Sequence, residues 1–544
     1  MTARSVEGDG DDCTNRTVTA ASIAAVRSGK LRRLRHEAIA TLMQNGTQTD
    51  QRQIERFDVL IVGAGISGIG AAHHLQTRCP HKTYAILESR AAIGGTWDLF
   101  RYPGVRSDSD MYTLGFSFRP WTAPKAIADG ASILQYVRDT AREFGIDEHI
   151  RFGTRVTRAQ WSSDASEWTV EATRDGAGVH YRCNFLFMCS GYYDYANGYT
   201  PHFAGIESFR GALVHPQHWD AQLDYAGKRV VVIGSGATAV TLVPELAKTA
   251  AHVTMLQRSP TYIVAAPSED RLADALRKIS AEFAYAATRW KNILFGMAFY
   301  AFCRRYPERV KAFIVGAVRR TLGAAYPVER DFAPAYGPWD QRMCLVPDGD
   351  LFDAIKAGRA SVVTDRIAAF VPDGIKLESG AQLPADVVVT ATGLNLSVLG
   401  DLAITVDGRR IDLATTLAYK GMMFSGVPNL ALSMGYTNAS WTLKCDLTCG
   451  YVCRLLNFMA RHGYTQCMPR DDATVERAPM IDLTSGYVQR SIDKFPKQGS
   501  KAPWRLYQNY LLDVMSLRFA PVDDGVLAFS GPERRAERLP ALAD

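Results

Sequence analysis

The chain has 544 residues, enough for about three domains of ordinary size. Apolar residues make up 47% and charged residues 22%, as in ordinary soluble globular proteins, and a net charge of +6 is too small at this length to indicate nucleic-acid binding. The longest apolar run, Ile293 to Cys303, is shorter than the ~20 residues that a membrane-spanning helix needs. The acidic N-terminus also lacks the basic and apolar regions of a signal peptide, so we expect a cytoplasmic protein.

The ten cysteines are scattered, and no two are spaced Cys-x-x-Cys, which argues against a zinc ribbon or a redox dithiol. Cys445, Cys449 and Cys453 recur every four residues and would share one face of a helix. Because no histidine lies within this stretch, we interpret them as small packing residues and expect no metal site. This cysteine usage fits a reducing cytoplasm.

The first 55 residues differ in composition from the rest of the chain. They are rich in Ser, Thr, Asn and Gln, and a basic patch extends from Arg27 to Arg35. We expect residues 1–55 to form a disordered extension, with a short basic amphipathic helix as the alternative.

A glycine fingerprint for a dinucleotide spans Asp58 to Gly68, between a β-strand pattern and a helical pattern. Gly63 permits the tight turn, Gly65 lets the backbone approach a pyrophosphate, and Gly68 lets helix and strand pack closely. The second strand of the unit ends at Glu88, where a carboxylate would accept the ribose hydroxyls. The pattern therefore predicts a dinucleotide site rather than a ligand-free glycine turn.

A second fingerprint spans Val230 to Ala239, with alanine in its third position. After its second strand the chain continues with Arg258 and Ser259 instead of a carboxylate. A carboxylate would repel a 2′-phosphate, whereas an arginine can pair with one. We therefore expect this unit to bind NADPH rather than NADH, and two fingerprints in one chain indicate a flavin together with a nicotinamide.

A third motif lies between the fingerprints, in a stretch rich in Pro, His and aromatic residues that we interpret as a linker. It reads Phe209-x-Gly211-x-x-x-His215-x-x-x-Trp219-Asp220. We expect His215 to anchor two domains by hydrogen bonds rather than to move protons.

With a further segment from Gly94 to Asp108 (GGTWDLFRYPGVRSD), the chain resembles the class B flavoprotein monooxygenases of the Baeyer–Villiger type. Within that group it is similar to the ethionamide-activating monooxygenases of mycobacteria, over about residues 57–510. The resemblance implies an α/β fold with two Rossmann-like domains, for FAD and NADPH, and a helical insertion in the second. The expected segments are 56–205 and 383–544 for the FAD domain, 206–228 for the linker, 229–267 and 339–382 for the NADPH domain, and 268–338 for the insertion.

Two buried strand patterns, Ala385–Gly393 and Pro428–Leu432, are expected to return the chain to the first domain. In the insertion, basic residues alternate with aromatic ones. Peripheral contact with a membrane surface is one interpretation of this pattern, and a solvated helix face over a core is the other.

The resemblance also implies which residues contact the cofactors. Arg342 aligns with the family's active-site arginine, and Asp108 would orient it; many members have a lysine just before that arginine, where this chain has Gln341. The expected FAD contacts are Gly63, Gly65, Ser67, Gly68, Glu88, Thr96, Trp97, Asp98, Leu99, Asp108 and Val156. The expected NADP contacts are Arg106, Ser107, Asp108, Gly234, Ser235, Gly236, Ala237, Thr238, Ala239, Val240, Arg258 and Ser259.

The implied reaction inserts one oxygen atom of O2 into a ketone through a C4a-peroxyflavin, giving an ester or lactone, with sulfides and thioamides as further substrates. No obligatory protein partner is expected. A flavin-containing N- or S-monooxygenase is the alternative, although its linker motif normally lacks a tryptophan at the position of Trp219. A disulfide reductase would need a redox cysteine pair, and a non-catalytic flavin sensor would not need Arg342 and Asp108.

Overall fold

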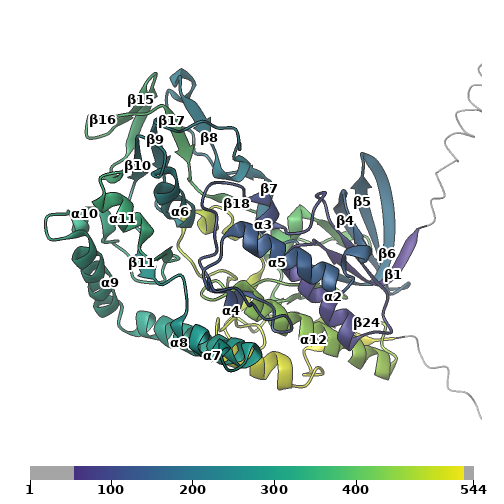
Figure 1. Ribbon diagram of the computed structural model, residues 1–544. Coiled ribbons are helices and arrows are strands. Elements are labelled where there is room, and N and C mark those ends of the chain that lie inside the picture. Colours follow the sequence, from purple (N-terminus) through teal and green to yellow (C-terminus); the bar gives the residue numbers. More distant parts are fainter. Residues whose placement is uncertain (1–53, 532–544) are drawn as a thin grey trace, which may run out of the picture. The chain divides into compact units, whose positions relative to one another are not determined.

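The computed structural model describes residues 54–531. The expected disorder of residues 1–55 concerns a segment that lies, apart from its last two residues, outside the described part. The remainder contains two α/β units that follow the two fingerprints, together with helices that connect them (Figure 1).

The first unit is built on a nine-stranded sheet of the described chain, in the order β20-β19-β4-β5-β6-β1-β2-β3, with β23 beside β6. β1 and β2 pair in parallel, from Val59 opposite Tyr84 to Val62 opposite Leu87, whereas β4, β5 and β6 form an antiparallel meander. The strands are β1 (Glu55–Val62), β2 (Tyr84–Leu87), β3 (Ile150–Arg151), β4 (Thr154–Ser162), β5 (Glu167–Arg174), β6 (Ala177–Met188), β19 (Ala403–Val406), β20 (Arg409–Arg410) and β23 (Leu430–Leu432).

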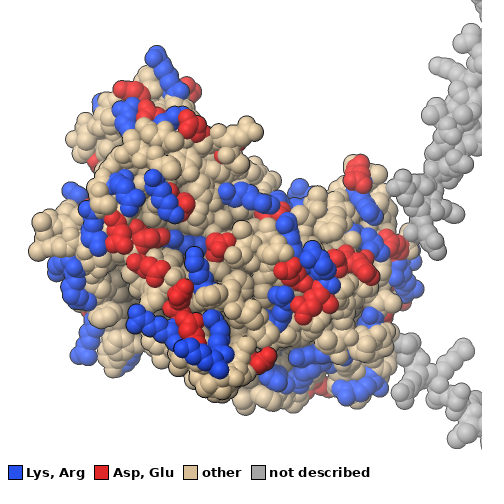
Figure 2. All heavy atoms as spheres, in the orientation of Figure 1, with Lys and Arg blue, Asp and Glu red and all other residues tan. Residues whose placement is uncertain are grey.

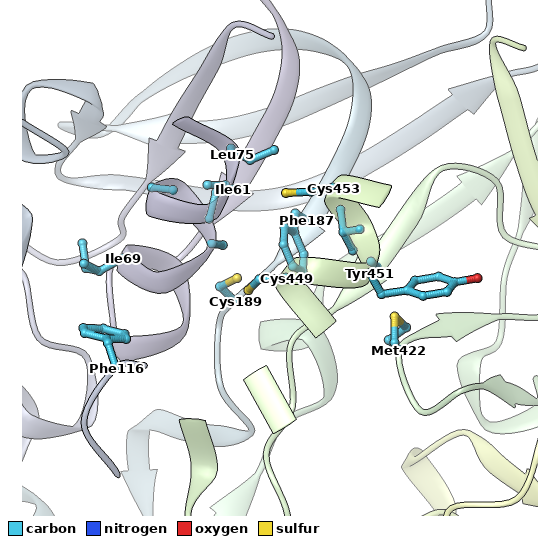
Figure 3. Packing of buried hydrophobic residues seen from close by; sticks show 14 of the residues in the cluster. Ile61, Ile69, Leu75, Phe116, Phe187, Cys189, Met422, Cys449, Tyr451 and Cys453 are labelled. Atoms are coloured by element: carbon cyan, nitrogen blue, oxygen red, sulfur yellow. The ribbon is translucent and has the colours of Figure 1, made fainter. Parts of the chain in front are cut away.

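Helices cover the parallel part of this sheet. They are α2 (Ile66–Arg78), α3 (Thr96–Leu99), α4 (Met111–Leu114), α5 (Gly130–Glu143) and α12 (Trp441–His462). Figure 3 shows α2 beside α12, with Ile61 and Phe187 of the sheet packed against them. Cys449 and Cys453 point into this apolar cluster, which confirms them as packing residues.

The second unit is a five-stranded parallel sheet in the order β13-β10-β9-β17-β8, with α6 (Ala237–Leu246) and α11 (Asp350–Lys356) packed beside it. Its strands are β8 (Ala212–Val214), β9 (Arg229–Ile233), β10 (His252–Gln257), β13 (Ala360–Thr364) and β17 (Val387–Thr390). The valines of β9 are buried on both faces, as expected of a central parallel strand.

One expectation about the return of the chain is wrong. β17 pairs with β9 of the second sheet, Val387 opposite Val230, and so does not belong to the first sheet. A continuous apolar run shows that a strand is buried, but it does not show with which strand it pairs. β23, by contrast, pairs with β6 of the first sheet as predicted.

Short strands connect the two units, and others form small separate sheets. β7 (Tyr193–Gly198) pairs with β18 (Leu394–Leu396), directly after the first sheet's β6 and the second sheet's β17. Two further small sheets are β11 (Ile263–Ala266) with β12 (Cys344–Pro347), and β14 (Ile367–Val371) with β15 (Gly374–Leu377) and β16 (Gln382–Pro384).

The expected helical insertion consists of α7 (Arg271–Arg277), α8 (Ala281–Arg305), α9 (Pro307–Leu322) and α10 (Val328–Phe332). α9 packs on the second unit through Val315 and Val318. α8 reaches the first unit, because the buried Arg289 donates to the carbonyls of Tyr112 at 2.7 Å and Gly115 at 2.9 Å. None of the helices in the described part is both long and apolar enough to cross a membrane.

The last part of the described residues packs on the first unit. It contains β21 (Ala418–Tyr419), β22 (Met423–Phe424), β24 (Gln466–Pro469), β25 (Arg477–Pro479), α13 (Gly486–Gln489), β26 (Lys497–Gly499), α14 (Tyr510–Asp513), the π-helix η7 (Val514–Phe519) and β27 (Leu527–Ser530). Arg454 of α12 holds η7 by donating to the carbonyl of Leu517 at 2.7 Å.

Candidate active site

A cavity of about 1030 Å³ lies where both fingerprints meet. Ligands of open parallel sheets bind beyond the carboxyl ends of the strands, and both glycine turns stand at such ends. Most of the predicted contacts line it, namely Gly63, Gly65, Ser67, Glu88, Thr96, Trp97, Arg106, Ser107, Asp108, Val156, Gly234, Ser235, Gly236, Ala237, Thr238, Arg258, Ser259 and Arg342. Five do not, namely Gly68, Asp98, Leu99, Ala239 and Val240.

The glycines of the first fingerprint have different tasks. Gly63 has a positive φ of 105°, and an added Cβ would lie 2.7 Å from the carbonyl oxygen of Cys189. At Gly68 a Cβ would lie 1.9 Å from the carbonyl oxygen of Gly63, so the helix packs on the strand only with glycine there. At Gly65 the nearest atom to a Cβ is at 3.6 Å, and the space in front of this residue belongs to the cavity.

Glu88 is buried at the end of β2, where its carboxylate also holds the turn together. Its two oxygens accept the backbone N–H groups of Ala64 and Arg90, both at 2.7 Å. Burial raises the pKa of this carboxyl above its ordinary value, and these donors oppose the shift. The carboxylate is therefore fixed on the wall of the cavity, at the position expected for a ribose contact.

The second fingerprint has the same design. Gly234 has a φ of 135° and would bring a Cβ to 2.3 Å from the carbonyl oxygen of Ala391, whereas nothing lies within 4 Å of a Cβ on Gly236. Arg258 follows β10, and the exposed Arg366 follows the neighbouring parallel strand β13, so both guanidinium groups line the cavity at the same edge of the sheet. Neither has an acidic partner within the described residues. Sequence reasoning missed Arg366, which follows a buried strand just as Arg258 does.

The segment from Gly94 to Asp108 connects the two units. Asp98 is buried and accepts Arg90 at 2.5 Å, Arg101 at 2.6 Å and Arg138 at 3.1 Å. Its role here is therefore to fix the loop, since it does not reach the cavity. Arg106 forms an ion pair with Asp350 of α11 at 2.5 Å, which ties this loop to the second unit.

Arg342 and Asp108 come together on the cavity wall although they are far apart in the sequence. Nε of Arg342 lies 3.0 Å from one oxygen of Asp108, and Nη2 donates to the other at 3.0 Å. The negative charge of Asp108 raises the pKa of the guanidinium above its already high ordinary value, against the opposing effect of burial. Arg342 lines the cavity, and no hydrogen bond of its Nη1 to a described residue is seen.

An aromatic group that sequence reasoning missed surrounds this arginine. The hydroxyls of Tyr192 and Tyr193 are 3.1 Å apart, and the ring of Tyr192 stacks on Trp441 with centroids 5.2 Å apart. Tyr487 completes the group from α13. Burial raises the pKa of all three tyrosines, so they stay neutral beside the guanidinium. The signal for the first pair was their place directly after the buried strand β6 and Gly191.

The linker motif stands outside the cavity, at the edge of the second sheet. Nδ1 of His215 accepts the N–H of Gln217 at 3.2 Å, so Nε2 carries the proton that it donates to the carbonyl of Gly393, also at 3.2 Å. A Cβ on Gly198 would lie 2.1 Å from the imidazole ring, and burial lowers the pKa of His215. Phe209 packs under Phe370, and Trp219 packs on the core of the second unit. The motif thus anchors the strands that connect the units.

The cavity fits a flavin and a nicotinamide dinucleotide. Gly65 and Gly236 leave open space for two phosphate chains, each at the N-terminus of a helix. The buried hydroxyls of Ser190 and Ser397 line the same cavity and have no hydrogen-bond partner within the described chain, so they are available to a bound ligand.

Comparison with known proteins agrees with this geometry. Residues 119–275 match the flavin-binding monooxygenase-like family, and residues 61–123 match the NAD(P)-binding Rossmann-like domain. The chain is 56% identical over 479 residues to the FAD-containing monooxygenase EthA of Mycobacterium tuberculosis, covering 88% of this chain and 98% of that protein. It is 52% identical to EthA of Mycolicibacterium smegmatis, covering 88% and 97%.

Solved structures show the same fold. An oxidized steroid monooxygenase bound to NADP has a TM-score of 0.72 at 24% identity, covering 88% of this chain and 100% of that one. Cyclohexanone monooxygenase from Rhodococcus sp. Phi1, bound to NADP+, has a TM-score of 0.67 at 21% identity with the same coverage. The family assignment overturns the disulfide reductase and the non-catalytic sensor as alternatives. The chain belongs to the FAD-containing, NADPH-dependent flavin monooxygenases, as a relative of EthA.

Proposed function

We propose that this monooxygenase is of the Baeyer–Villiger type and converts ketones into esters or lactones. The observation that carries the proposal is the paired Arg342 and Asp108 in the cavity that both fingerprints line. When bound, FAD supplies the activation of O2 after its reduction by NADPH. The protein must then stabilise negative charge on oxygen and keep water away from the reacting atoms.

Arg342 suits the first task because a guanidinium stays charged at any accessible pH. Asp108 holds two of its nitrogens, so the third is oriented before any substrate arrives. A preorganised donor in a dry site stabilises a developing oxyanion strongly. In this role Arg342 is the catalytic residue and Asp108 the residue that orients it.

The aromatic group suits the second task. Neutral tyrosines line the cavity beside the guanidinium, and Trp441 stacks on one of them, so these rings add apolar surface to the cavity without adding negative charge. We infer an apolar ketone as the substrate, with sulfides and thioamides as further substrates. An N- or S-monooxygenase without ketone activity is the second candidate, because the same cavity would admit a thioether.

We further infer that FAD uses Gly63, Gly65, Ser67, Glu88 and Thr96, which line one part of the cavity wall. The nucleotide of NADPH would use the turn at Gly234–Thr238, with Arg258 and Ser259 at its 2′-phosphate. Many members of the family have a lysine where this chain has Gln341. Arg366 lines the same cavity and supports the proposal, since it would supply a second cation in place of that lysine.

The test is product analysis with the purified enzyme, NADPH, and a matched ketone and thioether of similar size. Gas chromatography should show ester from the ketone in proportion to the NADPH consumed. Sulfoxide from the thioether without ester from any ketone would establish the second candidate instead.

A further inference from the structure

Exposed large apolar side chains gather in two segments of the chain. Fourteen of the sixteen that the described residues expose belong to residues 272–313 or 507–519. They are Leu272, Ile279, Phe283, Trp290, Leu294, Phe295, Phe302, Tyr306, Phe313, Tyr507, Leu511, Leu512, Met515 and Phe519, here called the apolar patch. Soluble monomers rarely expose so many large apolar groups together, so this clustering indicates a surface that contacts a partner.

The two segments meet although more than 200 residues separate them in the chain. The rings of Trp290 in α8 and Tyr510 in α14 are in edge contact, with centroids 5.9 Å apart. Along α8 the inner face is used by Tyr285, Arg289 and Ile293, which pack on the first unit. The outward face of the same helix is apolar, with Phe295 69% exposed.

The charge around the apolar patch is strongly positive. Residues 271–322 contain eleven basic and three acidic residues, a net charge of +8, which exceeds the +6 of the whole chain. Six of these basic side chains have no acidic partner within the described residues, namely Arg271, Lys278, Arg305, Arg309, Lys311 and Arg320. Figure 2 shows blue groups between tan surface, with some red groups among them, along the left and lower left, where α9, α8 and α7 lie in Figure 1.

We propose that the apolar patch docks on the surface of an anionic lipid bilayer. Apolar side chains flanked by unpaired cations are the pattern of interfacial helices, whose rings enter the acyl boundary while Lys and Arg contact the headgroups. A second copy of the chain fits less well. A twofold interface would bring together two surfaces that each carry these six unpaired cations, within the screening distance.

The position of the patch adds a consequence that rests on the proposed function. Ile293, on the inner face of α8, packs against Tyr436, and Tyr436 lines the cavity together with Ala439. A single layer of side chains thus separates the bilayer-facing helix from the cavity. Docking there would bring the cavity close to apolar substrates dissolved in the membrane.

The experiment measures vesicle binding by the full-length enzyme with FAD bound. Vesicles of phosphatidylcholine alone are compared with vesicles that contain about one third phosphatidylglycerol, because the cations should respond to the anionic lipid. The apolar variant is F295S/F313S, and the charge variant is R305Q/K311Q. The matched controls are L213S and R409Q, which change an exposed leucine and an exposed arginine elsewhere.

We expect the enzyme to float with the anionic vesicles, and both patch variants to lose at least tenfold in partition coefficient. The controls should bind as the unchanged enzyme does. Equal binding by the patch variants, or binding that ignores anionic lipid, would overturn the proposal, since another part of the chain would then be responsible. So would a dimer in light scattering that the patch variants abolish. NADPH oxidation without lipid should be unchanged in all variants, so a failure of docking is distinguishable from a failure of the proposed reaction.

Discussion

Replacement of Arg258 by alanine should weaken the binding of NADPH and leave the binding of NADH nearly unchanged. The guanidinium lines the cavity just after β10 and has no acidic partner within the described residues, so its charge is available to a 2′-phosphate. A charge-assisted hydrogen bond contributes about 1.5–3 kcal/mol, and solvent screening of this exposed group favours the lower end. The KM for NADPH should therefore rise roughly tenfold, because about 1.4 kcal/mol corresponds to one factor of ten.

Arg366 gives this prediction a second, independent arm. R366A should raise the KM for NADPH in the same direction, and R258A/R366A should approach the product of the two effects if each guanidinium contacts the phosphate separately. The assays are the KM for NADPH and for NADH at fixed ionic strength, with calorimetric binding of 2′,5′-ADP as a readout without turnover.

The matched control is R359A, an exposed arginine at the opposite end of β13. An equal rise in the KM for NADPH and for NADH in R258A would refute Arg258 as the residue that binds the 2′-phosphate. An equally large rise in the KM for NADPH in R359A would refute it as well.

Three further changes test other parts of the structure. H215A should slow both flavin reduction and oxygenation in stopped-flow measurements while FAD stays bound, because the imidazole anchors the connection between the units; normal hydride transfer with no oxygenation would contradict this role. G65V should fold, since a Cβ meets nothing within 3.4 Å, yet purify without the yellow colour of FAD; a yellow variant would show that the flavin lies elsewhere. Burial lowers the pKa of His73 to about 4, so unfolded chains bind more protons below pH 6.5 and stability should fall as the pH drops toward 4. Urea titrations at pH 7 and 4.5 measure this loss in the free energy of unfolding, and H73F should reduce it by up to about 3 kcal/mol. If the loss is the same in H73F, His73 is not its cause.

Local sequence patterns were enough to predict both fingerprint units. Gly63, Gly65 and Gly68 lie within a few residues of one another, so their spacing in the sequence is enough to predict the turn and the close packing of the helix on the strand. The partner of β17 could not be predicted in this way, because a run of valines is equally buried in either sheet.

The candidate site shows the same division between local and distant information. Arg342 and Asp108 were paired only through the family resemblance, and the structure brings them to 3.0 Å. Two partners of Tyr192, Trp441 and Tyr487, come from α12 and α13, more than 200 residues later, and no local pattern joins such distant segments. Asp98 was expected at the flavin from its motif alone, but its three arginine partners are visible only in three dimensions.

The central claim is that Arg342 directs the activated oxygen to the substrate. The most direct measurement is the yield of ester per NADPH consumed by R342A, determined by gas chromatography beside a hydrogen peroxide assay. FAD should stay bound, because neither glycine turn is touched, and ester formation should fall by at least ~10²–10³ in rate, the usual loss for one preorganised oxyanion donor. NADPH that is still consumed should appear as hydrogen peroxide. Ester at a rate near that of the unchanged enzyme would show that Arg342 is not the catalytic arginine.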